Sequence, residues 1–411
     1  MLDIKFIREN KELIKKNCVD RKVKIDIDML LETDEKRRGL IKKIEDLRAL
    51  RKQTSKGKPN EEEIMKMRLV GDEIKTNEEI LANIDSEYNV LMMAVPNLTH
   101  PDAPIGGEND FKVIYENKKP PKFDFQPLDH EELMVKKDLI DFERGAKVAG
   151  TKFYFCKNQM VRLNLALINY GLDILEKHGF TIVETPDMAK NEILSGVGFN
   201  PRGPETQVYS VENTDLSLIG TAEITMGGYH ANEILDLSKG PKKYAALSHC
   251  FRTEAGAYGK TSKGLYRVHQ FTKLEMFIYC CPEDSEMLHQ EILAIEKEIV
   301  DGLEIPYRVI DTASGDLGGP AYRKYDLEAF MTMSNGYGEI TSTSNCTDYQ
   351  ARRLNIRYRK NNVENEFVHT LNGTAIVSSR FPIALVENHQ QADGSIAIPK
   401  VLQKFCGFKK I

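Results

Sequence analysis

The chain has 411 residues, of which 41% are hydrophobic and 29% charged. This balance is typical of a globular protein with two or three domains. The formal net charge of −5 excludes binding to nucleic acid through overall positive charge, so any such contact requires a local basic patch. No run approaches the roughly 18 apolar residues of a membrane span, and the N-terminus lacks signal and transit patterns. We therefore expect a cytoplasmic protein without membrane contact.

The cysteines predict reduced structural thiols. Seven cysteines are scattered along the chain, with no C-x-x-C pair and no Cys/His pair at zinc-ligand spacing. Such a pattern is typical of a reducing compartment. We expect no zinc site.

Apolar residues repeat every seven positions between residues 67 and 91, which predicts the seam of a coiled coil. The two lines of the repeat are Met67, Ile74, Leu81 and Tyr88, and Val70, Ile84 and Leu91, with polar Asn77 interrupting the second line. An earlier stretch, 30–53, carries apolar residues at helical spacing. A turn at 54–60 contains Gly and Pro, and three glutamates suited to a helix N-terminus follow it. The sequence therefore predicts an N-terminal antiparallel two-helix arm.

The first helix of this arm is basic. A solvated helix face is the usual explanation of such a run, whereas contact with a nucleic-acid backbone would use the clustered cations to neutralise phosphates. The candidate residues for that contact are Arg37, Arg38, Lys42, Arg48, Arg51 and Lys52. The Pro- and Gly-rich stretch 95–107 cannot continue a helix and serves as a linker. We place the domain boundary in it, giving domains 1–105 and 106–411.

The second domain mixes strands and helices. Strand-like runs cover 179–186, 243–251 and 268–280, and helices are expected over 163–178 and, as the final helix, 383–390. No Gly-rich phosphate loop of the Walker or dinucleotide type is present, which disfavours a Rossmann fold. The pattern fits the α+β class, with an antiparallel sheet flanked by helices.

Two short apolar runs, 251–254 and 267–275, flank a polar Gly-rich loop and predict a long-looped hairpin. Such a hairpin can hold Arg252 bidentately against a phosphate or carboxylate. A salt-bridged surface hairpin is the alternative explanation. The sequence of the segment favours the anion-binding hairpin, because it closely resembles motif 2 of class II aminoacyl-tRNA synthetases and, within that class, of the seryl-tRNA synthetases. The resemblance is carried by F-R-T-E-A-G, the loop G-K-T-S-K-G-L and R-V-H-Q-F.

The resemblance extends along essentially the whole chain, with motif 1 near 163–186, motif 2 near 247–277 and motif 3 near 371–390. It implies the class II synthetase fold, a homodimer built through motif 1, and a helical arm that grips tRNA. It also implies an ATP-dependent ligase that activates L-serine to seryl-adenylate and transfers it to the 3′ end of tRNA(Ser). No general base or nucleophile is needed, because catalysis rests on positioning and electrostatics.

The same resemblance assigns roles to individual residues. Arg252 and Arg380 would be catalytic, stabilising phosphate charge. The serine site would comprise Thr221, Ala222, Glu223, Arg252, Glu275 and Thr374. The ATP site would comprise Arg252, Thr253, Glu254, Val268, Phe271, Glu339, Ile340, Thr341, Ser342 and Arg380. Glu339 and Ser342 would hold Mg²⁺, which prefers hard oxygen ligands. For each of these residues taken alone, a surface group, a helix cap or a salt bridge remains the simpler interpretation.

Two alternatives stay open at this stage. The chain could be an amino-acid-activating paralogue that charges a carrier protein, although such relatives lack the arm. It could also be a non-catalytic tRNA-binding paralogue, which would have lost the ATP arginines or the metal ligands.

The motif 2 loop departs from the sequence common in the family, because Thr261 and Lys263 replace the common Asp and Arg. Lysine keeps the charge but loses the planar fork of arginine.

Overall fold

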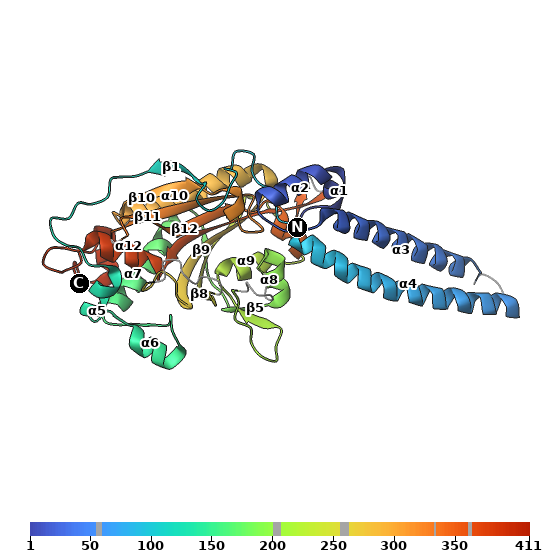
Figure 1. Cartoon of the computed structure of the whole chain (residues 1–411), viewed down its shortest axis with the longest axis horizontal. Coiled ribbons are helices and arrows are strands. Elements are labelled where there is room, and N and C mark those ends of the chain that lie inside the picture. The colour runs from blue at the N-terminus through green and yellow to red at the C-terminus, as the bar shows by residue number, and fades with distance from the viewer. Residues whose placement is uncertain (55–59, 200–206, 255–262, 333, 361–363) are drawn as a thin grey trace. The chain divides into compact units, whose positions relative to one another are not determined.

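The computed structural model describes residues 1–54, 60–199, 207–254, 263–332, 334–360 and 364–411 (Figure 1). The chain divides into two compact units, Met1–Leu98 and Thr99–Ile411. The division falls inside the Pro- and Gly-rich stretch between residues 95 and 107. Within the described ranges, no helix combines the length and apolar character needed to cross a membrane.

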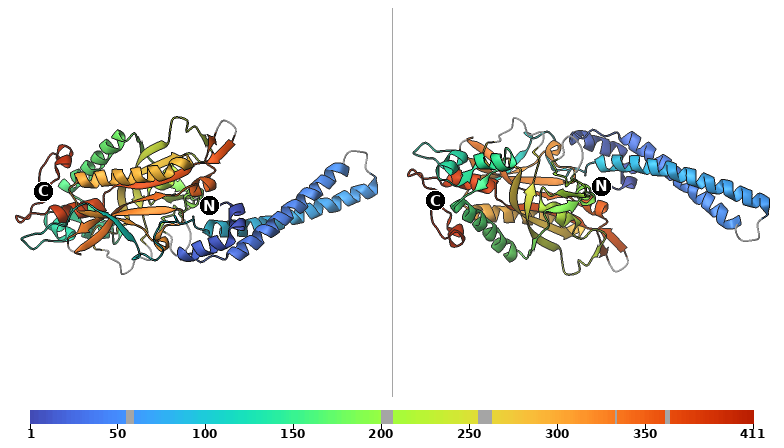
Figure 2. Two further views of the ribbon diagram at one scale, coloured as in Figure 1. Left: turned by 90° about the horizontal axis from the view of Figure 1, so that it is seen from above. Right: turned by 90° about the horizontal axis from the view of Figure 1, so that it is seen from below.

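The first unit is helical and contains the predicted arm. Its helices are α1 (Ile4–Glu9), α2 (Lys11–Asp20), α3 (Ile27–Thr54) and α4 (Glu61–Ala94). The long helices α3 and α4 lie side by side in both views of Figure 2. Helix α4 begins with a capping box, in which the Asn60 side chain accepts from the Glu63 amide and the Glu63 side chain accepts from the Asn60 amide. This reciprocal pair satisfies two amide donors that a helix start leaves free.

Apolar contacts between α3 and α4 follow the predicted seam. Ile44 of α3 is buried with Val70 and Ile74 of α4. Asn77 occupies the same seam with only 6% of its surface exposed, and its side-chain amide donates to the Glu73 carbonyl one turn earlier, at 2.6 Å. The amide is therefore satisfied within its own helix. A separate apolar cluster at the base of the arm joins α1, α2, the start of α3 and the end of α4.

An antiparallel sheet forms the centre of the second unit. Within the described residues it has eight strands in the order β1-β10-β11-β12-β15-β9-β8-β4, and the β4/β8 pair alone is parallel. The strands are β1 (Lys112–Glu116), β10 (Tyr307–Asp311), β11 (Arg323–Met331), β12 (Gly336–Asn345), β15 (His369–Val377), β9 (Gln270–Cys280), β8 (Lys242–Phe251) and β4 (Thr181–Glu184). The small sheets use β14 (Glu364–Phe367), β13 (Arg357–Lys360) and β7 (Ile234–Leu235), then β2 (Ile140–Asp141) with β3 (Phe155–Cys156), and β5 (Met188–Lys190) with β6 (Leu216–Leu218).

Helices pack against both faces of this sheet. The helices of the unit are α5 (His130–Lys136), α6 (Phe142–Ala149), α7 (Gln159–Lys177), α8 (Asn191–Val197), α9 (Ala222–Gly228), α10 (Ser285–Gly302), α11 (Tyr349–Leu354), α12 (Arg380–His389) and α13 (Lys400–Cys406). Helices α7 and α10 contact β15, and α9 contacts β8 and β9. The predicted antiparallel α+β fold with a two-helix arm is thus confirmed. Helix α13 was not expected, since the sequence suggested that the helix before it was the last.

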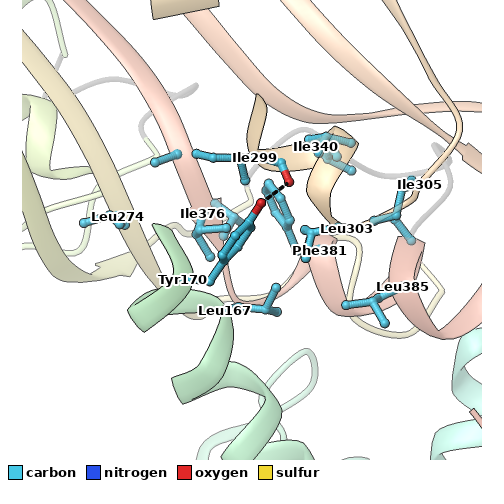
Figure 3. Packing of buried hydrophobic residues seen from close by; sticks show 14 of the residues in the cluster. Leu167, Tyr170, Leu274, Ile299, Leu303, Ile305, Ile340, Ile376, Phe381 and Leu385 are labelled. Atoms are coloured by element: carbon cyan, nitrogen blue, oxygen red, sulfur yellow. Dashed lines mark hydrogen bonds between the residues drawn. The ribbon is translucent and has the colours of Figure 1, made fainter. Parts of the chain in front are cut away.

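Side-chain alternation along the strands separates the core from the other face. On β9, Leu274 and Met276 join the apolar cluster shared with α7 and α10, while Phe277 and Tyr279 join the cluster under α8 and α9. Figure 3 shows the first cluster, in which the Tyr170 hydroxyl donates to the Ile299 carbonyl at 3.3 Å. From Lys273 onward, the odd-numbered residues of β9 therefore face away from this core, and Lys273 lines the site described below.

Asn77→Leu is expected to stabilise the arm. A leucine at this seam position adds buried apolar surface and removes a polar group that contributes no bond between the helices, for a gain of about 1 kcal/mol. Hydrogen exchange of the α4 amides in the full chain should slow about fivefold. Glu79→Leu on the exposed side of α4 is the matched control and should leave these rates unchanged. Faster exchange in Asn77→Leu would show that the seam depends on the amide.

Candidate active site

Two adjoining cavities contain most of the residues predicted to bind substrates. The larger has a volume of about 680 Å³ and the smaller about 60 Å³. They share Arg252, Glu254 and Arg380 in their walls. Another cavity of about 670 Å³ lies beside β7 and β13 and is lined by none of the predicted residues. The shared walls identify one continuous candidate site on the sheet.

Arg252 follows directly after β8, and its backbone is paired to the other side of the predicted hairpin. Its amide donates to the His269 carbonyl at 3.0 Å, and His269 Nδ1 donates to the Arg252 carbonyl at 2.8 Å. The guanidinium lies over the Phe271 ring, 5.3 Å from its centroid, and Nε donates to the Gly220 carbonyl at 3.2 Å. Arg252 lines both cavities, where a guanidinium can bind an anion.

Arg380, the first residue of α12, also lines both cavities. Its Nη1 is 2.9 Å from Glu339 Oε1 and donates to the Glu339 carbonyl at 3.2 Å. Its guanidinium also lies over the Tyr266 ring, 5.1 Å from the centroid. Burial alone would raise the pKa of the Glu339 carboxyl, but Arg380, Lys324 and Arg252 hold that pKa below its ordinary value. Glu339 is therefore a carboxylate at neutral pH.

A β-bulge brings Glu339 and Ser342 to one face of β12. In a regular strand, residues three positions apart point to opposite faces. Here Thr341 pairs with Leu327 and Glu339 pairs with Glu328, so Ile340 is an extra residue in the ladder. The bulge restores Glu339 and Ser342 to the same side, and both line the smaller cavity.

A buried ionic cluster occupies the part of the site predicted to bind serine. Lys273 Nζ forms an ion pair with the Glu275 carboxylate and donates to Thr221 Oγ1 at 3.1 Å. Thr221 also caps α9 by accepting from the Glu223 amide. Thr374 on β15 is the ladder partner of Glu275. Burial raises the pKa of Glu275, an effect that Lys273 opposes.

Glu223 has an amide partner in place of a cation. Gln350 Nε2 donates to its Oε1 at 2.8 Å, and Gln350 Oε1 accepts from the Thr370 hydroxyl. Burial, together with the nearby charge of Glu275, raises the Glu223 pKa from 4.5 to about 7. A buried carboxyl with this pKa gains strongly from a cationic ligand, because a neighbouring positive charge favours ionisation.

Not every predicted residue reaches a cavity. Val268, Phe271, Ile340 and Thr374 line the smaller cavity and Glu223 the larger. The Ala222 side chain is buried in the apolar cluster under α8, and the Thr253 amide donates to the Gln207 carbonyl. The Thr341 hydroxyl points to the other face of the sheet, where it donates to Glu296 Oε2 of α10 at 3.0 Å. Thr261 lies outside the described residues.

Three contacts of this site were missed from the sequence. Lys273 lies two residues before Glu275, so strand periodicity could have placed both on one face. Tyr266, whose ring contacts the Arg380 guanidinium, is the last residue of the predicted loop, where no strand periodicity indicated its position. Gln350 belongs to α11, far along the chain from Glu223, and no local pattern indicates that contact.

Among the described residues, no group of three or more His, Cys, Asp or Glu side chains could hold a metal ion.

Three of the six candidate basic residues of the arm form ion pairs in the structure. Arg37 pairs with Asp85 at 2.6 Å, Arg38 with Asp34 at 3.0 Å and Arg48 with Glu78 at 2.7 Å. Lys42, Arg51 and Lys52 are exposed.

Comparison with known proteins gives matches in both units. Residues 207–389 match the tRNA synthetase class II core domain (G, H, P, S and T), and residues 1–99 match the seryl-tRNA synthetase N-terminal domain. The serine–tRNA ligase of Treponema denticola is 53% identical, with 100% of both chains covered. That of Rhodopirellula baltica is 51% identical over 99% of this chain and 98% of its own.

Solved structures give the same result. Seryl-tRNA synthetase from Pyrococcus horikoshii complexed with ATP is 40% identical, with a TM-score of 0.92 over 100% of this chain and 99% of that one. Cytoplasmic serine–tRNA ligase from Naegleria fowleri in complex with AMP is 33% identical, with a TM-score of 0.86 over 100% and 98%. The fold and the matched core define a class II aminoacyl-tRNA synthetase. Within that class, the chain belongs to the seryl-tRNA synthetase family, whose general function is amino acid activation and tRNA charging.

The raised pKa of Glu223 should be visible in the pH dependence of stability. Between pH 4.5 and about 7 the folded state holds the proton and the unfolded state releases it, so stability falls as pH rises through this range, by about 3 kcal/mol. Glu223→Gln removes the titration. The melting temperature of Glu223→Gln relative to wild type should therefore rise from pH 5 to pH 7.5. Glu176→Gln, on the exposed side of α7, is the control, and an equal change in both variants would contradict the assignment.

Proposed function

We propose that the two adjoining cavities bind ATP and L-serine, and that the enzyme joins them as seryl-adenylate before transferring serine to the 3′ end of tRNA(Ser). The observation that carries this proposal is the convergence of Arg252, Arg380 and Glu339 with the buried Glu223 around one site, next to Glu275, whose ion-pair partner Lys273 lines the smaller cavity. Arginines suit phosphates, and buried carboxylates suit an ammonium group. The two halves of the site thus match the two substrates.

The proposed chemistry needs only positioning and charge stabilisation. The serine carboxylate attacks the α-phosphorus of ATP, and pyrophosphate leaves. Arg252 would contact both the α-phosphate and the serine carboxylate, and Arg380 the γ-phosphate. Thr253 would contribute through its backbone, and Glu254, Val268 and Phe271 would lie against the adenine. Charge that develops on the phosphorus oxygens is then stabilised by groups already fixed in place.

For serine, we assign the ammonium to Glu223 and the hydroxyl to Glu275 and Thr374. Thr221 and Ala222 would hold this site by starting α9 beside it. A site built to hydrogen-bond a substrate hydroxyl rejects alanine, because buried polar groups would be left unpaired.

Magnesium is the ion that these oxygen ligands fit. The Glu339 carboxylate and the Ser342 hydroxyl line the same small cavity, and hard oxygen donors with phosphate oxygens complete the usual Mg²⁺ set. The ion would neutralise phosphate charge. Binding it requires Glu339 to exchange its ion pair with Arg380, which then becomes available to phosphate.

The N-terminal domain (1–105) would bind tRNA(Ser) and the second domain (106–411) would carry out catalysis. Phosphates would replace the acidic partners of Arg37, Arg38 and Arg48 and contact the exposed Lys42, Arg51 and Lys52. A cytoplasmic homodimer completes the proposal. The dimer is supported by the exposed apolar side chains of Val161 and Leu165 on the motif 1 helix α7, 44% and 59% exposed. The reducing compartment is supported by seven cysteines outside disulfides.

The direct test is charging of purified tRNA(Ser) with labelled serine, ATP and Mg²⁺, with threonine and alanine as competing substrates. We expect charging with serine only, and serine-dependent ATP–pyrophosphate exchange without tRNA. Exchange without transfer to tRNA would favour charging of a carrier protein. Absence of exchange would favour a non-catalytic paralogue.

Glu339→Gln should raise the Mg²⁺ concentration needed for half-maximal pyrophosphate exchange by roughly tenfold or more, because a neutral amide is a weak ligand for Mg²⁺. The KM for serine should change little. Glu328→Gln is a matched control, since Glu328 is also a strand carboxylate paired with an arginine, Arg308 at 2.5 Å, but does not line either cavity. Equal magnesium dependence in wild type and Glu339→Gln would refute this metal assignment.

A further inference from the structure

Helix α5, which contributes no predicted site residue, contacts both motif 2 and motif 3. Asp129 caps α5 by accepting from the Glu132 amide at 2.8 Å, and its carboxylate also forms an ion pair with Lys263. The Asp129 side chain is 10% exposed and that of Lys263 56%. Although burial opposes ionisation, the Glu132 amide and Lys263 hold the pKa of Asp129 below its ordinary value. The carboxylate thus keeps its charge at neutral pH.

His130, the first residue of α5, links the same two motifs a second time. Its Nδ1 is 2.8 Å from Glu387 Oε1 in α12, and its Nε2 accepts from the Leu265 amide at 3.4 Å. A single neutral tautomer, protonated on Nδ1, satisfies both contacts. The side chains of His130 and Glu387 are 9% and 4% exposed, so water cannot readily replace either partner.

The backbone at Gly264 shows how closely this link is packed. Gly264 has φ +60°, and a Cβ built there would lie 2.2 Å from His130 Nε2. Only glycine combines that backbone conformation with such an approach. Just before α5, Leu128 and the Gln390 side chain exchange two hydrogen bonds, at 2.8 and 2.9 Å. The segment 128–130 is therefore tied to residues 263–265 and to the end of α12.

The next residues along the chain enter the proposed ATP site. Tyr266 lies under the Arg380 guanidinium, and Arg267 Nη1 is 3.3 Å from Glu254 Oε2. Tyr266 lines the smaller cavity and Arg267 the larger. The position of residues 263–265 therefore determines where both side chains lie.

We propose that Asp129 and His130 are positioning residues for ATP: they hold residues 263–265 against α12 and so fix Tyr266 and Arg267 in the nucleotide site. The proposal rests on the function given above. It also assigns a role to Lys263, as the partner of Asp129.

The test is a double-mutant cycle on the ion pair in the full-length enzyme, measured by ATP–pyrophosphate exchange. Asp129→Asn removes the charge but keeps the helix cap, since asparagine caps as well as aspartate, and Lys263→Met removes the other charge. Each variant should raise the KM for ATP about three- to tenfold, with the KM for serine within about twofold of wild type. The double variant should be no worse than either single variant, and Lys263→Arg should retain the wild-type KM for ATP.

Asp141→Asn is the matched control, because Asp141 also caps a helix, α6, while pairing with an arginine, Arg144. It should leave both KM values unchanged and show a melting temperature similar to that of Asp129→Asn. An unchanged KM for ATP in both single variants, or effects that multiply in the double variant, would overturn the proposal. A loss of kcat with both KM values constant would also do so, since it would indicate a merely structural role. Wild type without serine-dependent exchange would instead refute the proposed function.

His130→Asn provides an independent second variant. Its side-chain amide keeps a donor near Nδ1 for Glu387 and removes the acceptor for the Leu265 amide. The KM for ATP should again rise about three- to tenfold, with the KM for serine nearly constant. A wild-type KM for ATP in this variant would exclude His130 from positioning.

Discussion

The charge balance on the cavity face of the central strands is the constraint on which the site depends. Strand β9 presents the buried Glu275 and strand β12 presents Glu339, whose side chain is 39% exposed, and each has a cation beside it, Lys273 and Arg380 respectively. A buried charge without a partner costs several kcal/mol. The buried Glu275 can therefore be maintained there only because Lys273 of the same strand supplies a cation, while α12 supplies Arg380 to Glu339.

The same balance explains how such a site can accept charged substrates. Arg380 and Glu339 satisfy each other, so a phosphate at the arginine and a metal ion at the carboxylate would each replace a partner already present. Glu223 is different, because its direct partner is the Gln350 amide and its pKa is about 7. An ammonium group would provide Glu223 with the cation it lacks, which is a physical basis for selecting an amino acid there.

Much of this arrangement could be predicted from the sequence, for identifiable reasons. Heptad spacing indicated the arm, and the motif 2 segment indicated the hairpin that holds Arg252, because both depend on residues close together in the chain. Lys273 could have been found from strand periodicity. In contrast, Thr341 was assigned to the ATP site together with its neighbours, whereas its side chain lies on the opposite face beside Glu296. Ordinary alternation places Thr341 opposite Ser342, and the bulge at Ile340 places it opposite Glu339 as well.

Contacts between distant segments were beyond such patterns. The approach of Gln350 to Glu223 and of His130 to Glu387 depends on how α11 and α5 pack in the finished fold. These contacts also clarify why a sequence motif contains residues that never reach the cavity. Glu387 and Gln390 belong to motif 3, yet their side chains bind residues 128–130, at the start of α5. A substrate site of this kind needs one set of side chains to meet the ligands and another to hold the first set in place, and a motif read along the chain contains both.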